Sequence, residues 1–462
     1  MRLTTKLITL TRALALSIST TAIAADPPRF EMLDLCDISG TLSGVPYHIN
    51  NDGTVTGIAD FDGTGDFQGV VWVGGTQAIQ LSTLPGEHAS VGAATSEAGL
   101  PVGTSYIIEE KYGRWYFYPT AVLWDGLVPV SLQDLVTSGP PDLELDEALA
   151  VNNHGVIIGA ARDTVLERGR AFRLDVNTGE LIDLGTLGGN SARPDAMNDN
   201  GIIVGQAWTA GGQNHAFRWE NGSMTDLGTF GGRDSRATDV SESGRIVGGA
   251  QSTTSPELAV LWDVDGSMIN LGTLGGNQSN ANGISDDGAI VGFSTDSINY
   301  AHAFFYEDGT MWNLIDLIPP NQGWAGRANA LGINDAQQVT GTMYRQDLGD
   351  RPFVATRVHL TIEPPVPGQA GTVNTINLTG ATPGSSVYLV HGRNAALTAI
   401  PGCVGAPIHI ADPQLAGKAQ ADEKGNAVVQ GYVSNKASGK TLRLQAFERS
   451  ICKVSNVVIH EF

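Results

Sequence analysis

The sequence predicts an all-β protein, in which a seven-bladed β-propeller is closed by an N-terminal strand and followed by a C-terminal β-sandwich. Three observations lead to this prediction: a phrase that recurs about every 45 residues, short alternating segments after residue 368, and 58 glycines among 462 residues. A glycine content this high, without long helical patterns, is typical of chains with many tight turns.

The repeat is clearest in the middle of the chain. Residues 184–189 read Leu-Gly-Thr-Leu-Gly-Gly, and the phrase returns with small changes at 227–232 and 271–276. A second phrase places an apolar residue and a small polar pair before a turn that ends in Val-Gly or a variant of it. Its closing glycines are Gly57, Gly103, Gly159, Gly205, Gly248, Gly292 and Gly341. We therefore expect seven units, the outer ones degenerate as terminal repeats often are.

Each unit is expected to form four short strands, with an Asn-Asp-x-Gly type of turn between the first and second. Four strands in about 45 residues match one propeller blade, and a β-solenoid, which needs shorter units, is the alternative. The seventh unit has a third strand at 353–356 but no fourth, because the chain leaves through Pro364 and Pro365. The segment Phe30–Leu35 supplies the missing pattern, so we expect it to complete the last blade.

These phrases resemble the HAF family of extracellular bacterial repeats, named for the His-Ala-Phe found here at His215 and His302. The resemblance covers roughly residues 30–358 and is specific in units three to six. It implies an extracellular bacterial protein and implies no activity. The second unit departs from the pattern, because it lacks the Leu-Gly-Thr-Leu-Gly-Gly phrase.

The first 24 residues read as a secretory signal peptide, with a basic start, an apolar middle and Ala22-Ile23-Ala24 at the end. We therefore expect a secreted protein, extracellular or periplasmic. No other segment approaches the roughly 20 apolar residues that span a bilayer. The chain carries 48 acidic against 27 basic residues, for a net charge of −21. Such a surface repels nucleic acid and anionic lipid.

The predicted domains are the signal peptide at 1–24, the propeller at 25–362, a proline-rich linker at 363–368 and an Ig-like β-sandwich at 369–462. Alternating segments such as 373–379 and 427–433 predict the sandwich. Cys403 and Cys452 both lie in this domain, and in an exported protein we expect them to form a disulfide. Cys36 is then expected to be free and buried in the closing strand.

Chemistry-bearing motifs are sparse, and no catalytic residue is predicted. There is no His-x-x-x-His, Cys-x-x-Cys or Gly-x-Ser-x-Gly. His48 is a candidate base for a lyase-like site, although no partner is visible. Asp60, Asp62 and Asp66 alternate around a glycine turn, which suits calcium, and an acidic surface hairpin is the alternative. No other cofactor is expected.

The second unit carries an unusual aromatic hairpin, whose candidate ligand-binding residues are Tyr112, Trp115, Tyr116, Phe117 and Tyr118. Trp115 and Phe117 face one way on a strand, and Tyr116 and Tyr118 the other. Exposed rings would offer flat apolar faces to sugar rings or a partner surface. Alternatively, one face packs on the neighbouring blade and the other on the C-terminal domain.

Together these features predict a secreted, non-catalytic binding or scaffold protein that recognises polysaccharide or a cell-surface component such as a surface protein. The alternative is an extracellular polysaccharide-degrading enzyme, a propeller-type lyase or hydrolase. A propeller hosts either activity, so the fold alone does not choose between them.

Overall fold

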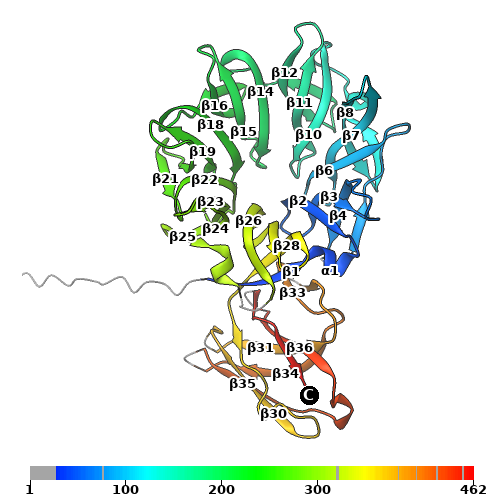
Figure 1. The fold of residues 1–462 in the computed structure, drawn as a ribbon, viewed down its shortest axis with the longest axis vertical. Coiled ribbons are helices and arrows are strands. Elements are labelled where there is room, and N and C mark those ends of the chain that lie inside the picture. Colours follow the sequence, from blue (N-terminus) through cyan, green and yellow to red (C-terminus); the bar gives the residue numbers. More distant parts are fainter. Residues whose placement is uncertain are drawn as a thin grey trace, which may run out of the picture.

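The protein is almost entirely β-structure, arranged as a ring of sheets with a second domain beside it (Figure 1). The computed structural model describes residues 28–462, apart from 75–76, 319–321, 383, 402, 423–424 and 450–451. The predicted signal peptide lies outside the described residues. Within the described part of the chain, no helix has the length and apolar character needed to cross a membrane.

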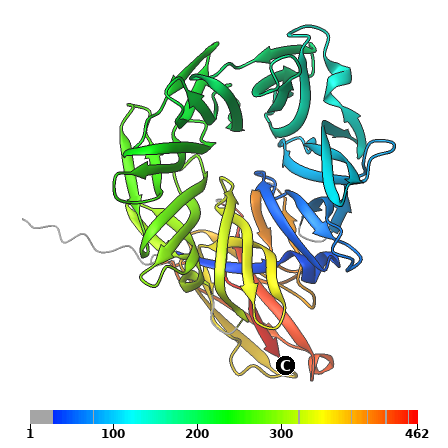
Figure 2. The same cartoon turned by 45° about the horizontal axis from the view of Figure 1, so that its top comes forward.

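Within the described residues, the ring contains seven four-stranded antiparallel sheets, which are arranged around a common centre (Figure 2). From the inside outward, the first three are β2 (Ser43–Ile49), β3 (Val55–Asp60), β4 (Gln68–Val73) and β5 (Gln77–Gln80); β6 (Ala89–Thr95), β7 (Pro101–Lys111), β8 (Arg114–Asp125) and β9 (Val128–Ser131); and β10 (Leu143–Val151), β11 (Val156–Asp163), β12 (Arg168–Asp175) and β13 (Glu180–Asp183).

The next three sheets are β14 (Gly188–Met197), β15 (Ile203–Thr209), β16 (Asn214–Glu220) and β17 (Ser223–Asp226); β18 (Gly231–Val240), β19 (Ile246–Ser252), β20 (Leu258–Trp262) and β21 (Met268–Gly272); and β22 (Gly275–Ile284), β23 (Ile290–Asp296), β24 (Ala301–Glu307) and β25 (Thr310–Asn313). Short 3₁₀ turns, η1 (Leu132–Leu135) and η2 (Leu314–Leu317), follow β9 and β25.

The seventh sheet joins the two ends of the ring. It consists of β26 (Trp324–Ile333), β27 (Gln338–Arg345), β28 (Gly349–Val358) and, as its outer strand, the N-terminal β1 (Arg29–Asp34). Phe30 pairs with Arg357 and Asp34 with Phe353, which confirms the predicted pairing of the N-terminal segment with the last unit. The prediction ran one residue too far, because Leu35 already begins helix α1 (Leu35–Ser39).

The sequence repeat has a clear structural origin. Every inner strand carries a β-bulge, and the glycine that closes each repeat lies opposite it, as Gly205 lies opposite Pro194. A Cβ on Gly205 would stand 2.3 Å from the carbonyl oxygen of Arg193, and the other six glycines meet the equivalent oxygen at 1.9–2.1 Å. The bulge therefore admits only glycine at this position.

The Leu-Gly-Thr-Leu-Gly-Gly phrase forms the crossing from one sheet to the next. In the third unit the Thr186 hydroxyl donates to the carbonyl of Gly189 and accepts the N–H of Gly188, and Asp183 accepts the N–H of Gly185. The same three contacts recur around Thr229 and Thr273. The phrase therefore satisfies its own backbone groups while it turns the chain inward.

The hydrophobic core of the ring lies between neighbouring sheets. One cluster joins Val204 and Ala216 of the fourth sheet to Ile246 and Trp262 of the fifth. The Trp262 indole N–H also donates to the carbonyl of Leu227, in the crossing loop between these sheets, at 2.9 Å. The fourth and fifth sheets are thus held together by apolar packing and by a hydrogen bond.

The C-terminal domain contains two larger sheets with a hydrophobic core between them. One sheet consists of β29 (Thr361–Ile362), β30 (Val373–Thr379) and β35 (Ala427–Tyr432). The other consists of β34 (Gln414–Gln420), β31 (Ser386–Gly392), β36 (Thr441–Glu448), β37 (Lys453–Val454) and β38 (Val458–Glu461). A hairpin of β32 (Thr398–Ile400) and β33 (Cys403–Ile408), and the 3₁₀ turn η3 (Asn435–Ala437), complete the domain.

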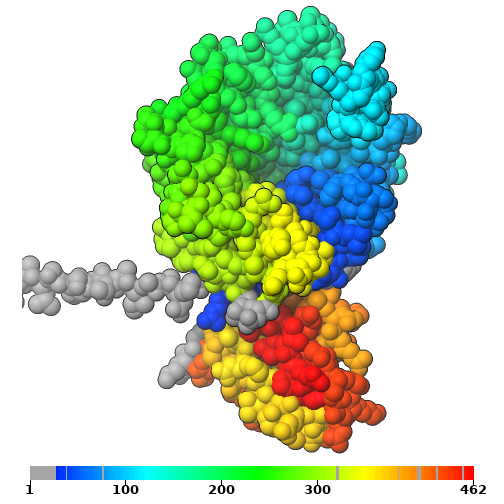
Figure 3. All heavy atoms as spheres, viewed as in Figure 1, coloured from blue at the N-terminus to red at the C-terminus, as the bar shows by residue number. Residues whose placement is uncertain are grey.

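The segment predicted as a linker is built into this domain. Thr361 pairs with Thr379, and Val366 exchanges backbone hydrogen bonds with Thr375. The C-terminal sheet therefore begins before residue 363 rather than at 369. Figure 3 shows the ring and the C-terminal domain as two lobes of unequal size.

The predicted disulfide between Cys403 and Cys452 is confirmed, with the two Cα atoms 5.2 Å apart. Cys36 is free and buried, as expected, but it lies in α1 rather than in the closing strand. The chain leaves β1 one residue early because the Asp34 carboxylate accepts the N–H of Cys36 and caps the helix.

Candidate functional site

A closed circle of hydrogen bonds fixes the orientation of the ring. In every unit, the turn after the inner strand carries a residue whose backbone N–H donates to the side chain of its counterpart in the next unit, at 2.7–3.1 Å. We call these residues the belt: Asn51, Glu97, Asn153, Asp199, Glu242, Asp286 and Asp335. Because all seven turns meet here, the hairpins between the second and third strands lie at the opposite face, which we call the hairpin face.

The aromatic hairpin of the second unit stands on the hairpin face. Its strands pair in unbroken register from Tyr106 opposite Pro119 to Lys111 opposite Arg114. Tyr112, at the tip, is fully exposed, and the exposed fractions of Trp115, Tyr116, Phe117 and Tyr118 are 64%, 40%, 60% and 44%. Neither side of the hairpin is buried, so the alternative in which both sides pack against the rest of the protein is wrong.

The two sides of this hairpin differ in chemistry. The side of Tyr116 and Tyr118 carries Lys111, whose ammonium donates to the Tyr118 hydroxyl and lies over its ring. The register places Ile108 opposite Phe117 and Glu110 opposite Trp115 on the other side. His88, in the preceding crossing loop, accepts the N–H of Ile108 and supports the base of the hairpin. The Trp115–Phe117 side is therefore an open apolar surface on a braced strand pair.

Exposed apolar side chains recur in the equivalent hairpins around the hairpin face. We call this set the apolar crown: Phe67, Trp115, Phe117, Val165, Leu166, Trp208, Ile298, Tyr300, Tyr344 and Leu348. Their exposed fractions run from 38% to 81%, and they come from six of the seven units. Sequence reasoning found only the members in the second unit. The signal for the others was an apolar residue inside a turn segment, as at Val165-Leu166 and Ile298.

The predicted calcium loop is organised by its own backbone. Asp60 is 6% exposed, and its carboxylate accepts the N–H groups of Asp62, Gly63 and Gly65. Asp62 accepts both the hydroxyl and the N–H of Thr64. Asp66 is turned to the surface, and no three acidic, His or Cys side chains of the described residues are placed to hold a metal ion. Calcium binding by this loop stays a prediction.

The two histidines that name the repeat each contact an aspartate close by. His215 Nδ1 lies 2.8 Å from Asp226, on the neighbouring strand of the same sheet. In the third unit Arg170 makes the equivalent pair with Asp183. His302 contacts Asp296 at 3.0 Å. These contacts tie adjacent strands together, which is a structural role.

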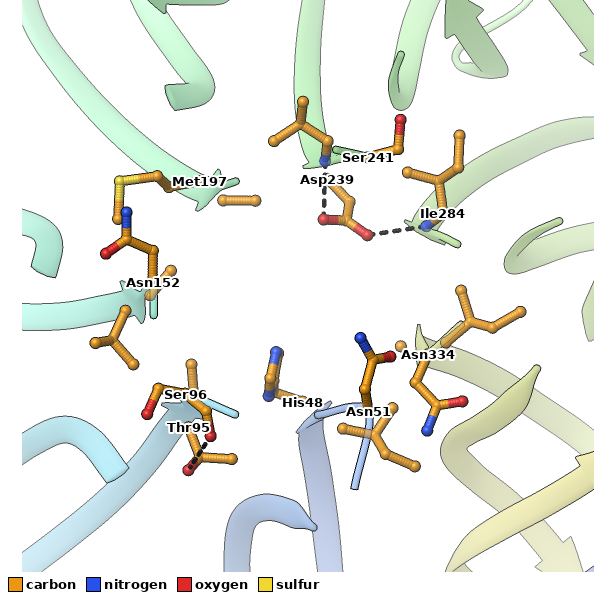
Figure 4. A pocket seen from close by; sticks show the side chains of 18 of the residues that line it. His48, Asn51, Thr95, Ser96, Asn152, Met197, Asp239, Ser241, Ile284 and Asn334 are labelled. Atoms are coloured by element: carbon orange, nitrogen blue, oxygen red, sulfur yellow. Dashed lines mark hydrogen bonds between the residues drawn. The ribbon is translucent and has the colours of Figure 1, made fainter. Parts of the chain in front are cut away.

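A cavity of about 330 Å³ occupies the centre of the ring and is lined by the inner strands and the belt. One inner-strand position, paired with the residue just before the repeat glycine, is Ala94, Ala150, Ala196, Gly283 or Gly332 in five units. The first and fifth units place His48 and Asp239 there instead. Figure 4 shows these two side chains entering the cavity from opposite sides.

Both side chains have altered acid–base properties. Burial lowers the pKa of His48 to about 4, so the imidazole is neutral near pH 7. Its Nδ1 is buried and has no hydrogen-bond partner among the described residues. Burial raises the pKa of Asp239 to about 6, although this carboxylate accepts the N–H groups of Ile284 and Val240 at 2.8 Å each. His48 was a candidate from the sequence, whereas Asp239 was missed.

Comparisons with known proteins do not assign the chain to a family. No family model and no curated protein matches the chain. Among solved structures, it is similar to a gluconolactonase from Xanthomonas campestris, with 13% identity and a TM-score of 0.34 over 72% of this chain and 96% of that one. TolB from Acinetobacter baumannii shares 12% identity at a TM-score of 0.36, over 70% of this chain and 66% of that one. YCF48 bound to a D1 peptide shares 12% sequence identity at a TM-score of 0.37, over 72% of this chain and 96% of that one. Likeness at this level carries no argument about function.

Proposed function

We propose that this chain is a secreted, non-catalytic binding protein: a seven-bladed β-propeller of the HAF repeat type with a C-terminal β-sandwich. In this proposal the apolar crown recognises a polysaccharide or another cell-surface component. One observation carries it, the exposure of Trp115 and Phe117 on the same side of a braced, projecting hairpin. Large apolar rings held open to solvent are costly for a soluble protein unless they are covered by a partner.

The chemistry of the hairpin favours sugar rings. The Trp115 and Phe117 rings offer flat faces for the apolar side of a sugar, and Glu110, on the same side of the hairpin, supplies a hydrogen-bonding group beside them. The net charge of −21 disfavours an acidic polysaccharide, so a neutral or basic one is the better match. The disulfide between Cys403 and Cys452 suits an oxidising compartment outside the cytoplasm.

A glycan array tests the proposal, with the wild-type protein, Trp115→Ala, Phe117→Ala and Tyr432→Ala. Tyr432 is 65% exposed on the C-terminal domain and serves as a matched surface control. We expect Trp115→Ala and Phe117→Ala to lower the affinity for the bound glycan at least tenfold, about 1.4 kcal/mol each. Because both rings are exposed, the melting temperature should not change, and Tyr432→Ala should bind like the wild type.

Two outcomes would contradict the proposal. If no glycan binds, or if Trp115→Ala and Phe117→Ala bind as tightly as the wild type, the hairpin is not a sugar-binding surface. A parallel assay for released unsaturated or reducing sugars covers the enzymatic alternative. Release of such sugars by the wild-type protein would replace a binding function by a lyase or hydrolase activity.

A further inference from the structure

The C-terminal domain contains a cavity that is separate from the crown and from the function proposed for it. The cavity measures about 400 Å³ and lies between the two larger sheets, one with β30 and β35 and the other with β31, β34 and β36 (Figure 1). Its walls include Ile376, Leu389, Val429 and Leu444, which also belong to the core of the domain. Because protein interiors have few voids larger than a water molecule, an opening of this size beside the core needs an explanation.

The cavity begins where the inward-facing rows of two strands change character. Every second residue of a strand faces the core, so on β31 Leu389 is followed inward by His391, and on β35 Val429 is followed by Gly431. A Cβ on Gly431 would meet its nearest atom, the carbonyl oxygen of Ala416, only at 3.9 Å. Gly431 is also not among the glycines with a positive φ. Neither crowding nor backbone geometry requires glycine here, and a glycine inside a strand can mark the place where a ligand approaches.

His391 supplies a free polar group in this apolar space. It is partly buried, lines the cavity and makes no hydrogen bond with any described residue, yet neither of its ring nitrogens is among the buried atoms without a partner. Both nitrogens therefore keep accessible surface. By contrast, Asn374, which pairs with Gly431, is fully engaged: its oxygen accepts the N–H groups of Gly368 and Gln369, and its amide donates to the carbonyl of Gln369.

The electrostatics of the cavity favour an uncharged ligand. Burial lowers the pKa of His391, so its imidazole is neutral near pH 7. No Asp, Glu, Lys or Arg side chain among the described residues lines the cavity. A carboxylate or an ammonium group would therefore lose its hydration here without gaining a counter-charge.

We propose that this cavity binds a small uncharged amphipathic molecule, whose alkyl chain occupies the space left by Gly431 and whose hydroxyl group hydrogen-bonds to His391. A neutral imidazole offers one donor and one acceptor, and a hydroxyl group can pair with either nitrogen. Apolar walls with few polar groups, around a volume of about 400 Å³, are typical of small-molecule sites.

Two variants test the two halves of this proposal. Gly431→Val fills the cavity, and it should not lower the melting temperature, because the position has room for a side chain and valine favours strands. His391→Leu removes the polar group and keeps the apolar lining. Val428→Ala is the control, since Val428 is 53% exposed on the opposite side of β35. Thermal melting of each purified full-length protein establishes that it is folded before binding is measured.

Isothermal titration calorimetry with 1-octanol, octanoate and octylamine as separate probes then measures binding, since these molecules share an alkyl chain and differ in the head group. We expect one 1-octanol per chain for the wild type and Val428→Ala, none for Gly431→Val, and roughly fivefold weaker binding for His391→Leu, the loss of one hydrogen bond.

Three results would overturn the proposal. The first is that the wild type does not bind 1-octanol, and the second is that all four proteins bind it equally. The third is that octanoate or octylamine binds more tightly than 1-octanol, which would mean that the head group is charged. None of these outcomes depends on whether the crown binds glycans.

Discussion

At the residue scale, the glycine that closes each repeat is set by a single close approach. The bulge of the inner strand brings a carbonyl oxygen against the Cα of the glycine, as Arg193 does at Gly205. This contact occurs in all seven units, including the degenerate ones, so the glycine persists where the other phrases are lost. His48 and Asp239, which line the cavity, directly follow this bulge on their strands, which links the repeat to the lining of the cavity.

We predict that Gly205→Ala destabilises the ring by about 1–3 kcal/mol, because a Cβ would stand 2.3 Å from a backbone oxygen that cannot move alone. Gly332→Ala is the matched control. It lies on β26, its Cβ would meet its nearest atom at 3.5 Å, and three other units have alanine at this position. Urea unfolding followed by circular dichroism measures both. Equal midpoints for the two variants would show that the bulge tolerates a side chain.

At the element scale, β1 closes the ring through both backbone pairing and charge. Asp34, at the end of β1, is buried and accepts hydrogen bonds from Arg345 at 2.7 Å and from Arg351 at 2.9 Å. Arg351 also donates to the carbonyl of Leu42, at the start of the first unit. The N-terminal strand, the last unit and the first unit are therefore joined at one buried carboxylate.

We predict that Asp34→Asn lowers the free energy of unfolding by about 3 kcal/mol, because it removes the buried one of the two carboxylates that Arg345 and Arg351 share. Asparagine keeps the oxygen that caps α1, and its NH2 group replaces the oxygen that accepts from Arg345 and Arg351, so the change removes both the charge and their acceptor but spares the cap. Asp37 contacts the same arginines, but its side chain is 49% exposed, and Asp37→Asn should cost at most about 1 kcal/mol. If the two variants melt at the same temperature, Asp34 is not the residue that secures closure.

The strands and turns could be predicted from the sequence where local residue patterns determine them. The Asn-Asp-Gly turns, the repeat glycines and the absent fourth strand of the last unit predicted the sheets and the role of Phe30–Leu35. The boundary at residue 363 was misplaced because prolines suggested a linker, whereas the backbone around Val366 still pairs with Thr375. Asp239 could have been found by aligning the seven units. Five of them have Ala or Gly at this inner-strand position, and the other two have His48 and Asp239. That the two face each other required the closed ring.

At the scale of the whole molecule, the junction between ring and C-terminal domain contains a buried acid. Glu31 of β1 is 5% exposed, and its carboxylate accepts the N–H of Val457 in the C-terminal domain at 3.1 Å. Burial raises the pKa of Glu31 to about 7, and the nearby Arg443 offsets this only in part. Glu31 therefore binds a proton in the folded protein at pH values where it is ionised in the unfolded chain.

This difference makes the junction sensitive to pH in a defined direction. Between about pH 4.5 and 7 the folded state binds more protons at Glu31 than the unfolded state, so its contribution to stability falls as the pH rises. We predict that the stability of the wild type relative to Glu31→Gln decreases by roughly 3 kcal/mol from pH 4 to pH 8. The difference between the two proteins is the quantity to measure, because Asp146 and Asp239 also have a raised pKa. Urea unfolding at five pH values provides it, with Glu363→Gln, at an exposed site, as the control. A constant difference across this range would mean that Glu31 is ionised in the folded junction and that Arg443 neutralises it.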